Sequence, residues 1–129
     1  MKIYSSPASI IEYVANQSLL KATWMIDAVS LTEEEVKNEI NNVLSFAREF
    51  HIKNIIVDSR LYPFRQNQDI QLWINHQFMP LIVDIGVEKY AIIVTEPMSN
   101  QVPSLYGEDE DLQVEYFTEY KEAEQWIAS

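Results

Sequence analysis

The chain contains no cysteine and only two glycines among its 129 residues. The lack of cysteine excludes disulfide bonds, thiolate metal ligands and thiol nucleophiles. Cations are also scarce, because nine lysines and arginines stand against 20 aspartates and glutamates, which gives a formal net charge of −11. An acidic surface repels nucleic-acid backbones and anionic membranes. We therefore expect no nucleic-acid binding.

Long hydrophobic runs are missing as well. No apolar stretch approaches the ~18 residues that cross a bilayer as a helix, and residues 1–7 lack the apolar core of a signal peptide. We therefore expect a cytoplasmic protein without a transmembrane segment. Hydrophobic residues make up 47% of the chain and charged residues 22%, which is typical of a folded protein. The length corresponds to one domain over residues 1–129.

Two short and nearly unbroken apolar runs are the clearest structural signals in the sequence. They occupy residues 54–58 and 90–95 and are rich in isoleucine and valine. A continuous β-branched run is typical of a strand covered on both faces, as in the parallel sheets of α/β proteins. The sequence therefore predicts two buried central strands.

The N-terminal half predicts a β-hairpin followed by a helix. Residues 10–14 and 19–26 have strand composition and flank a polar break that suits a short turn. Thr32 and Glu35 then form a capping-box pattern, and we expect a helix from there to about His51. Its inward stripe recurs at helical spacing: Val36, Ile40, Val43, Leu44, Ala47 and Phe50.

A second helical pattern precedes the run at residues 90–95. Asn67 is its expected N-cap. Pro80 lies inside the pattern and predicts a kink, or two helical pieces, near Met79. Gly86 is a natural C-terminal stop.

The remaining segments complete an alternating α/β pattern. We predict a strand over residues 87–95, an irregular region with room for a short helix over 99–106, a last strand over 114–117, and a final helix capped by Thr118. Alternation of helices and strands after a hairpin predicts an α/β fold with one mixed sheet of about four to five strands.

Besides this order of elements, the sequence contains three distinctive local patterns. They are IVDSR at residues 56–60, GVEKYAIIV at 86–94 and YFTEYKEAEQWI at 116–127. Together they resemble the SpoIIAA-like group of the STAS superfamily, over most of the chain from about Trp24 onward. The resemblance implies a mixed sheet backed by helices. It also implies a non-enzymatic role in protein interaction or small-ligand sensing.

One functional feature of that superfamily does not carry over. Its anti-sigma-factor antagonists are phosphorylated on a serine at the start of the helix after the strand that corresponds to residues 55–58. Here the matching neighbourhood, residues 66–69, reads Gln-Asn-Gln-Asp and offers no hydroxyl. Ser59 lies earlier, at the strand exit, and is not the matching position.

The first candidate binding site is the run Asp58, Ser59 and Arg60. Open α/β sheets bind ligands beyond the carboxyl ends of their strands, where Arg60 could hold an anion with two hydrogen bonds. The alternative is that Asp58 and Ser59 satisfy loop backbone donors while Arg60 pairs with a surface carboxylate. A hydrolase that uses these residues would also need a general base and oxyanion donors, for which the sequence shows no motif.

An aromatic group near the start of the second helix is the other candidate site. It consists of Tyr62, Phe64 and Trp73. These side chains either close over the edge of the core or form an exposed apolar patch for a partner or for self-association as a homodimer.

Metal or cofactor binding is not expected. His51 and His76 are the only histidines and have no suitably spaced carboxylate partner. The acidic run at residues 108–111 lacks the alternating ligands and the central glycine of a calcium loop.

We therefore expect a non-enzymatic interaction or regulatory domain. Two alternatives remain open: a carrier for a small apolar ligand or lipid, held between helices and sheet near the aromatic group, and a small hydrolase that uses Asp58 as a base.

Overall fold

Six strands form one mixed sheet in the part of the chain that the computed structural model describes, residues 1–61, 68–95 and 112–129. Their order across the sheet follows the sequence: β1 (Lys2–Ser5), β2 (Ser9–Val14), β3 (Leu19–Trp24), β4 (Asn54–Asp58), β5 (Lys89–Ile93) and β6 (Gln113–Phe117). The pairs β1–β2 and β2–β3 are antiparallel, and β3 to β6 are mutually parallel. The predicted α/β fold with a mixed sheet is confirmed, with one strand more than the upper end of the expected range.

The central strands are buried on both faces, as their composition predicts. Ile55 and Ile56 are neighbours on β4, point to opposite faces and are both fully buried. Ile55 belongs to the large core under the long helices, whereas Ile56 belongs to a smaller core on the other face. The runs at residues 54–58 and 90–95 therefore lie inside the sheet.

The predicted hairpin is confirmed as β2 and β3. Its connection is the short 3₁₀ turn η1 (Ala15–Gln17), and Ser18 takes the left-handed conformation with a φ of 48°. Hydrogen bonds hold Ser18 there, because its hydroxyl accepts from the backbone N–H of Lys53 at 3.1 Å and donates to the carbonyl of His51 at 3.3 Å. The turn is thus tied to the start of β4.

The helix α1 (Glu33–Glu49) begins and packs as predicted. Thr32 accepts a hydrogen bond from the backbone N–H of Glu35, and the Glu35 side chain accepts one from the N–H of Thr32. This second bond holds the pKa of Glu35 below its ordinary value. The stripe from Val36 to Ala47 is buried, and the helix ends at Glu49, two residues before the predicted end.

Loss of the capping hydroxyl should destabilise this helix measurably. Replacing Thr32 by alanine is expected to lower the free energy of unfolding by about 1 kcal/mol, because the N–H of Glu35 loses its acceptor. Urea denaturation measures the change. Ser30→Ala, at an exposed position of the preceding turn, is the control and should change stability by less than about 0.5 kcal/mol. Equal losses in both variants would contradict the capping role.

The second helical region consists of three continuous pieces. A π-helical turn, η4 (Ile74–Phe78), separates α2 (Gln68–Trp73) from α3 (Met79–Asp84). Pro80 lies in the first turn of α3, where its missing N–H leaves no bond to the preceding turn. The break predicted near Met79, as a kink or as two helical pieces, is confirmed as the boundary between η4 and α3, and a second boundary lies at Ile74. Gly86 follows α3 with a φ of +100°. The predicted N-cap, Asn67, lies outside the described residues.

One prediction about the last helix is wrong. The helix α5 (Tyr120–Ala128) has Glu119 rather than Thr118 at its N-cap position, and no side chain caps it there. Two lysines of the sheet instead hold it in place. Lys21 forms an ion pair with Glu124 at 3.1 Å, and Lys89 donates to the carbonyls of Trp126 and Ser129 at 2.9 and 2.8 Å.

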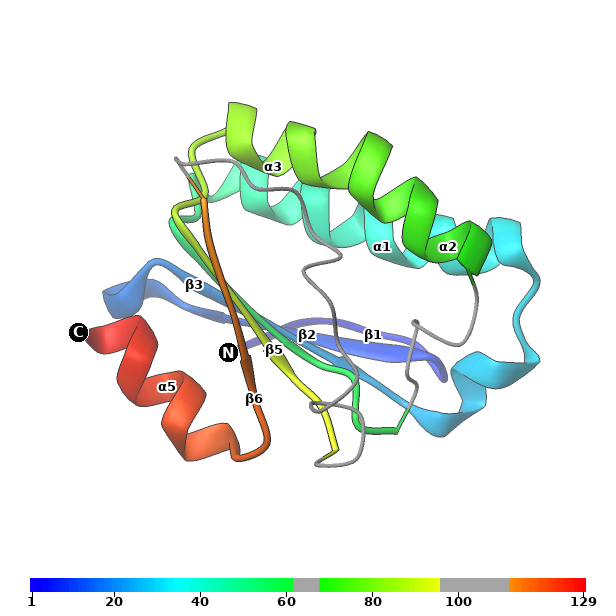
Figure 1. The fold of residues 1–129 in the computed structure, drawn as a ribbon, viewed down its shortest axis with the longest axis horizontal. Coiled ribbons are helices and arrows are strands. Elements are labelled where there is room, and N and C mark those ends of the chain that lie inside the picture. Colours follow the sequence, from blue (N-terminus) through cyan, green and yellow to red (C-terminus); the bar gives the residue numbers. More distant parts are fainter. Residues whose placement is uncertain (62–67, 96–111) are drawn as a thin grey trace.

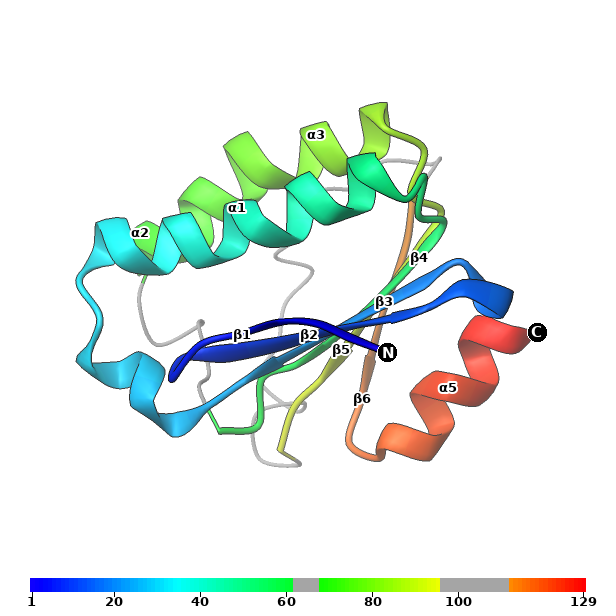
Figure 2. The same cartoon turned by 180° about the vertical axis from the view of Figure 1, so that it is seen from behind.

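The helices lie on opposite sides of the sheet. Figures 1 and 2 show α1, α2 and α3 together on one face and α5 alone on the other. Of the strands, α5 packs mainly against β4, β5 and β6, and Leu19 and Lys21 connect it to β3. None of the helices described here is both long and apolar enough to cross a membrane.

Candidate functional site

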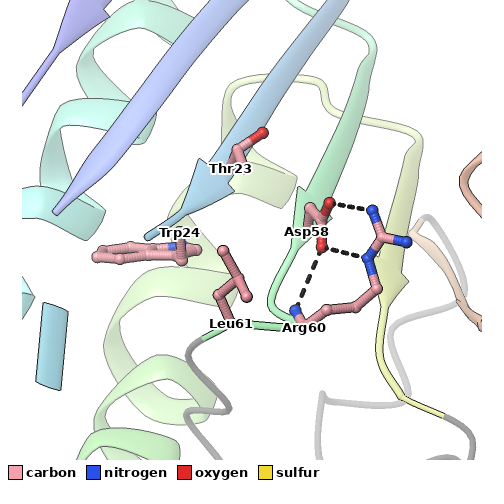
Figure 3. A pocket seen from close by; sticks show the side chains of 5 residues that line it. All are labelled: Thr23, Trp24, Asp58, Arg60 and Leu61. Atoms are coloured by element: carbon pink, nitrogen blue, oxygen red, sulfur yellow. Dashed lines mark hydrogen bonds and ion pairs between the residues drawn. The ribbon is translucent and has the colours of Figure 1, made fainter. Parts of the chain in front are cut away.

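A pocket of about 350 Å³ lies where β3 and β4 end. These strands are parallel neighbours, and Thr23 lies opposite Asp58 in their register. Their carboxyl ends therefore meet at one edge of the sheet, the position at which α/β sheets commonly bind ligands. Figure 3 shows the five residues that line the pocket: Thr23, Trp24, Asp58, Arg60 and Leu61.

The polar side of the pocket is an ion pair between neighbours in sequence. Arg60 donates from Nε to Oδ1 of Asp58 at 3.0 Å and from Nη2 to Oδ2 at 2.7 Å, and the backbone N–H of Arg60 donates to Oδ1 at 3.2 Å. These bonds raise the pKa of Arg60 above its ordinary value. The Asp58 carboxylate therefore accepts three hydrogen bonds from one residue, in the two-pronged geometry of strong pairs.

The Ser59 hydroxyl is buried and is not available as a nucleophile at this edge of the sheet. The hydroxyl donates to the carbonyl oxygen of Ile93 at 3.1 Å, the backbone N–H of Ser59 donates to the same oxygen at 3.0 Å, and the residue is buried. A nucleophilic serine needs a base within hydrogen-bond reach. His51 precedes β4 and so lies at the far end of that strand, which is roughly 13 Å long, while His76 is exposed on η4. Ser59 ties β4 to β5.

The apolar side of the pocket was not anticipated from the sequence. Trp24 is buried at the end of β3, and Leu61 follows the exit of β4 with 53% of its surface exposed. Beyond Trp24 the chain turns through the 3₁₀ segment η2 (Ile26–Ser30), where Ile26 and Val29 are 63% and 73% exposed. Figures 1 and 2 agree that this turn lies beside the segment that leaves β4. These residues come together because β3 pairs in parallel with β4, so only knowledge of that pairing would have identified them.

We refer to this surface as the β3–β4 rim. It comprises the pocket and the exposed apolar residues of η2: Thr23, Trp24, Ile26, Val29, Asp58, Arg60 and Leu61.

Charged groups of α5 lie near the rim on the other side of the ion pair. The pKa of Tyr120 is raised, first by burial and next by the negative charge of Glu124, and the charge of Asp58 adds to the same effect. The ammonium of Lys21 lies 5.2 Å from the centre of the Tyr120 ring. These groups fix α5 on the sheet.

Of the predicted aromatic group, only Trp73 lies among the described residues, and it does not line the pocket. Trp73 is half-buried, packs on the large core and lies under the Lys37 ammonium, 5.7 Å from its ring centre. For Trp73 the structure thus favours closure of the core. Tyr62 and Phe64 lie outside the described residues, as does the acidic run at residues 108–111.

Over residues 1–61, 68–95 and 112–129, no three histidine, aspartate or glutamate side chains lie close enough together to hold a metal ion.

Comparisons with protein-family models, with curated proteins and with solved structures found no match. The SpoIIAA-like resemblance therefore rests on the three sequence patterns, which the structure places at the end of β4, on β5 and across β6 and α5. Membership of that group remains a prediction.

Proposed function

We propose that this chain is a non-enzymatic interaction domain that binds a protein partner through the β3–β4 rim. The observation that carries the proposal is a division of roles at the pocket. The reactive groups, Asp58 and Ser59, are hydrogen-bonded within the chain. Leu61, which lines the pocket, and Ile26 and Val29, on the turn that follows Trp24, expose apolar surface instead. Exposed apolar side chains that gather around a pocket are typical of sites for partner binding.

The two alternative functions have less support in the geometry. A hydrolase that uses Asp58 as a base would need that carboxylate free to take a proton, yet it accepts three hydrogen bonds from Arg60. The Ser59 hydroxyl is not available to it as a nucleophile, because that hydroxyl is buried and donates to Ile93. A carrier would hold its ligand between the helices and the sheet, but the pocket lies at the edge of the sheet. Its volume is near the lower limit for small-molecule sites, roughly 300–1,000 Å³, and suits one inserted side chain.

Affinity capture with this chain as bait tests the proposal. Leu61 and Leu72 are equally exposed, at 53% and 54%, but Leu72 lies on α2 and does not line the pocket. A partner should be retained by the unmodified chain and by Leu72→Ser, and lost with Leu61→Ser. Retention by both variants would contradict the proposal. Hydrolysis of a nitrophenyl ester that disappears in Ser59→Ala would also contradict it.

A further inference from the structure

The apolar residues of the β3–β4 rim are flanked by acidic residues. Asp27 lies between Ile26 and Val29 on η2, and Glu33 and Glu34 follow at the start of α1. From residue 24 to residue 36 the sequence contains four carboxylates and no lysine or arginine. The turn η2 and the start of α1 therefore carry a net negative charge.

Three of these four carboxylates form no ion pair within the described part of the chain. Glu35 is used in the capping box with Thr32. Asp27, Glu33 and Glu34 are exposed, and none of them forms an ion pair with a described residue. The one arginine of the rim is already paired with Asp58. A ligand that brings positive charge would therefore neutralise carboxylates that no described residue pairs with.

The same charges disfavour a second copy of this chain as the occupant. Each copy has a formal net charge of −11, and a symmetric contact through the rim would place the carboxylates of one copy close to those of the other. Like charges across an interface oppose association. Anionic ligands and anionic lipid surfaces are disfavoured for the same reason.

We propose that the β3–β4 rim binds a segment of a partner protein in which an apolar anchor residue is flanked by lysine or arginine. This inference rests on the function proposed above and adds the chemistry of the partner. The anchor side chain enters the pocket between Trp24 and Leu61. The cationic side chains meet Asp27, Glu33 and Glu34 around it.

Calorimetric titration with synthetic peptides tests the chemistry. The probe consists of two Leu-Lys-Lys-Leu-Leu-Lys units. One control peptide replaces every lysine by glutamate, and a second replaces every leucine by serine. We expect the probe to bind and both controls to bind at least about tenfold more weakly. Binding of the probe should also weaken with added salt, because exposed charges are screened.

Matched variants of the chain locate the binding. Asp27→Asn combined with Glu33→Gln, and Leu61→Ser alone, should each weaken binding of the probe about tenfold. Asp84→Asn combined with Glu122→Gln removes two exposed carboxylates elsewhere, and this variant and Leu72→Ser should stay within about twofold. Far-UV circular dichroism checks that each variant is folded.

Three results would overturn the inference and leave the proposed function intact. Equal weakening by both double variants would mean attraction to net charge alone. Binding of the glutamate peptide as tightly as the probe would mean an apolar partner without a charge requirement. A dimer in light scattering that Leu61→Ser abolishes would make a second copy the occupant. Failure of the proposed function is seen separately, as ester hydrolysis that depends on Ser59.

Discussion

Replacing Ile56 by alanine is expected to lower the free energy of unfolding by about 2–5 kcal/mol, the range for removal of a fully buried isoleucine side chain. Ile56 is fully buried at the centre of β4, on the face that α5 covers. The core on this face is small, so little can move in to fill the cavity. Its other buried members are Leu19, Ala91, Ile93, Ala123 and Ile127.

The location of the damage distinguishes this variant from its neighbour. Ile55→Ala removes an equally buried side chain from the same strand, but from the large core under α1 and α3. In hydrogen exchange, Ile56→Ala should release the amides of α5 before the rest of the chain, because Ile56 belongs to the small core that α5 covers. Ile55→Ala should leave α5 no less protected than the sheet. Identical exchange patterns in the two variants would contradict the division into two cores.

Replacing Glu39 by alanine is the second large effect we expect, with a loss of about 2–3 kcal/mol. The Glu39 carboxylate on α1 accepts hydrogen bonds from the hydroxyl groups of Tyr4 and Ser6 at 2.6 and 2.5 Å and from the amide of Asn42 at 3.1 Å. The first two bonds join α1 to the edge strand β1 and to the turn that follows it. Their loss leaves partly buried donors without an acceptor. Urea denaturation measures the change.

A carboxylate on the same helix provides the control. Glu49 is exposed at the last position of α1, where a negative charge faces the negative end of the helix dipole. Glu49→Ala should therefore leave stability unchanged or raise it slightly. A loss in Glu49→Ala as large as in Glu39→Ala would show that the network around Glu39 is not the cause.

The same network predicts a dependence on alkaline pH. The hydrogen bond to Glu39, and then burial, raise the pKa of Tyr4 above its ordinary value of 10.0. The folded state therefore keeps this proton when the unfolded state has lost it. The stabilisation is complete below that ordinary value and is lost as the pH rises through the higher folded pKa. Tyr4→Phe should flatten this part of the stability profile.

Much of the fold follows from local sequence signals. The capping box at Thr32, the break at Pro80 and the stop at Gly86 each act within a few residues, so the sequence alone predicts them. The central strands are equally clear, because a strand buried on both faces needs an unbroken apolar run such as residues 54–58.

The errors arise where distant contacts decide the structure. The edge strand β1 has only four residues and is not buried, so its composition carries little signal, and its pairing with β2 and bonds to Glu39 define it. Thr118 has the chemistry of a helix cap, but the helix starts one residue later than that assignment requires. Contacts of Lys21 and Lys89 across the sheet hold α5 instead.

The sequence predicted only part of the candidate site, because the rest of it also depends on contacts between distant residues. Asp58, Ser59 and Arg60 are adjacent in sequence, so their place at a strand end is readable. The alternative that Asp58 and Ser59 satisfy backbone donors of the loop fits Asp58, which accepts from the backbone N–H of Arg60. It does not fit the other two, because Ser59 donates to Ile93 and Arg60 pairs with Asp58 itself rather than with a surface carboxylate. Trp24 and Leu61 are far apart in sequence and meet only because β3 and β4 are parallel neighbours. No local pattern reports that pairing.

The central claim is that recognition takes place at the β3–β4 rim. Chemical-shift mapping of the ¹⁵N-labelled chain, titrated with the leucine–lysine peptide, tests it most directly. We expect changes in amide chemical shift that are confined to η2, to the start of α1 and to the residues that follow β3 and β4. Shifts centred on α5 or β6, or no shifts at peptide concentrations that saturate the calorimetric signal, would contradict it.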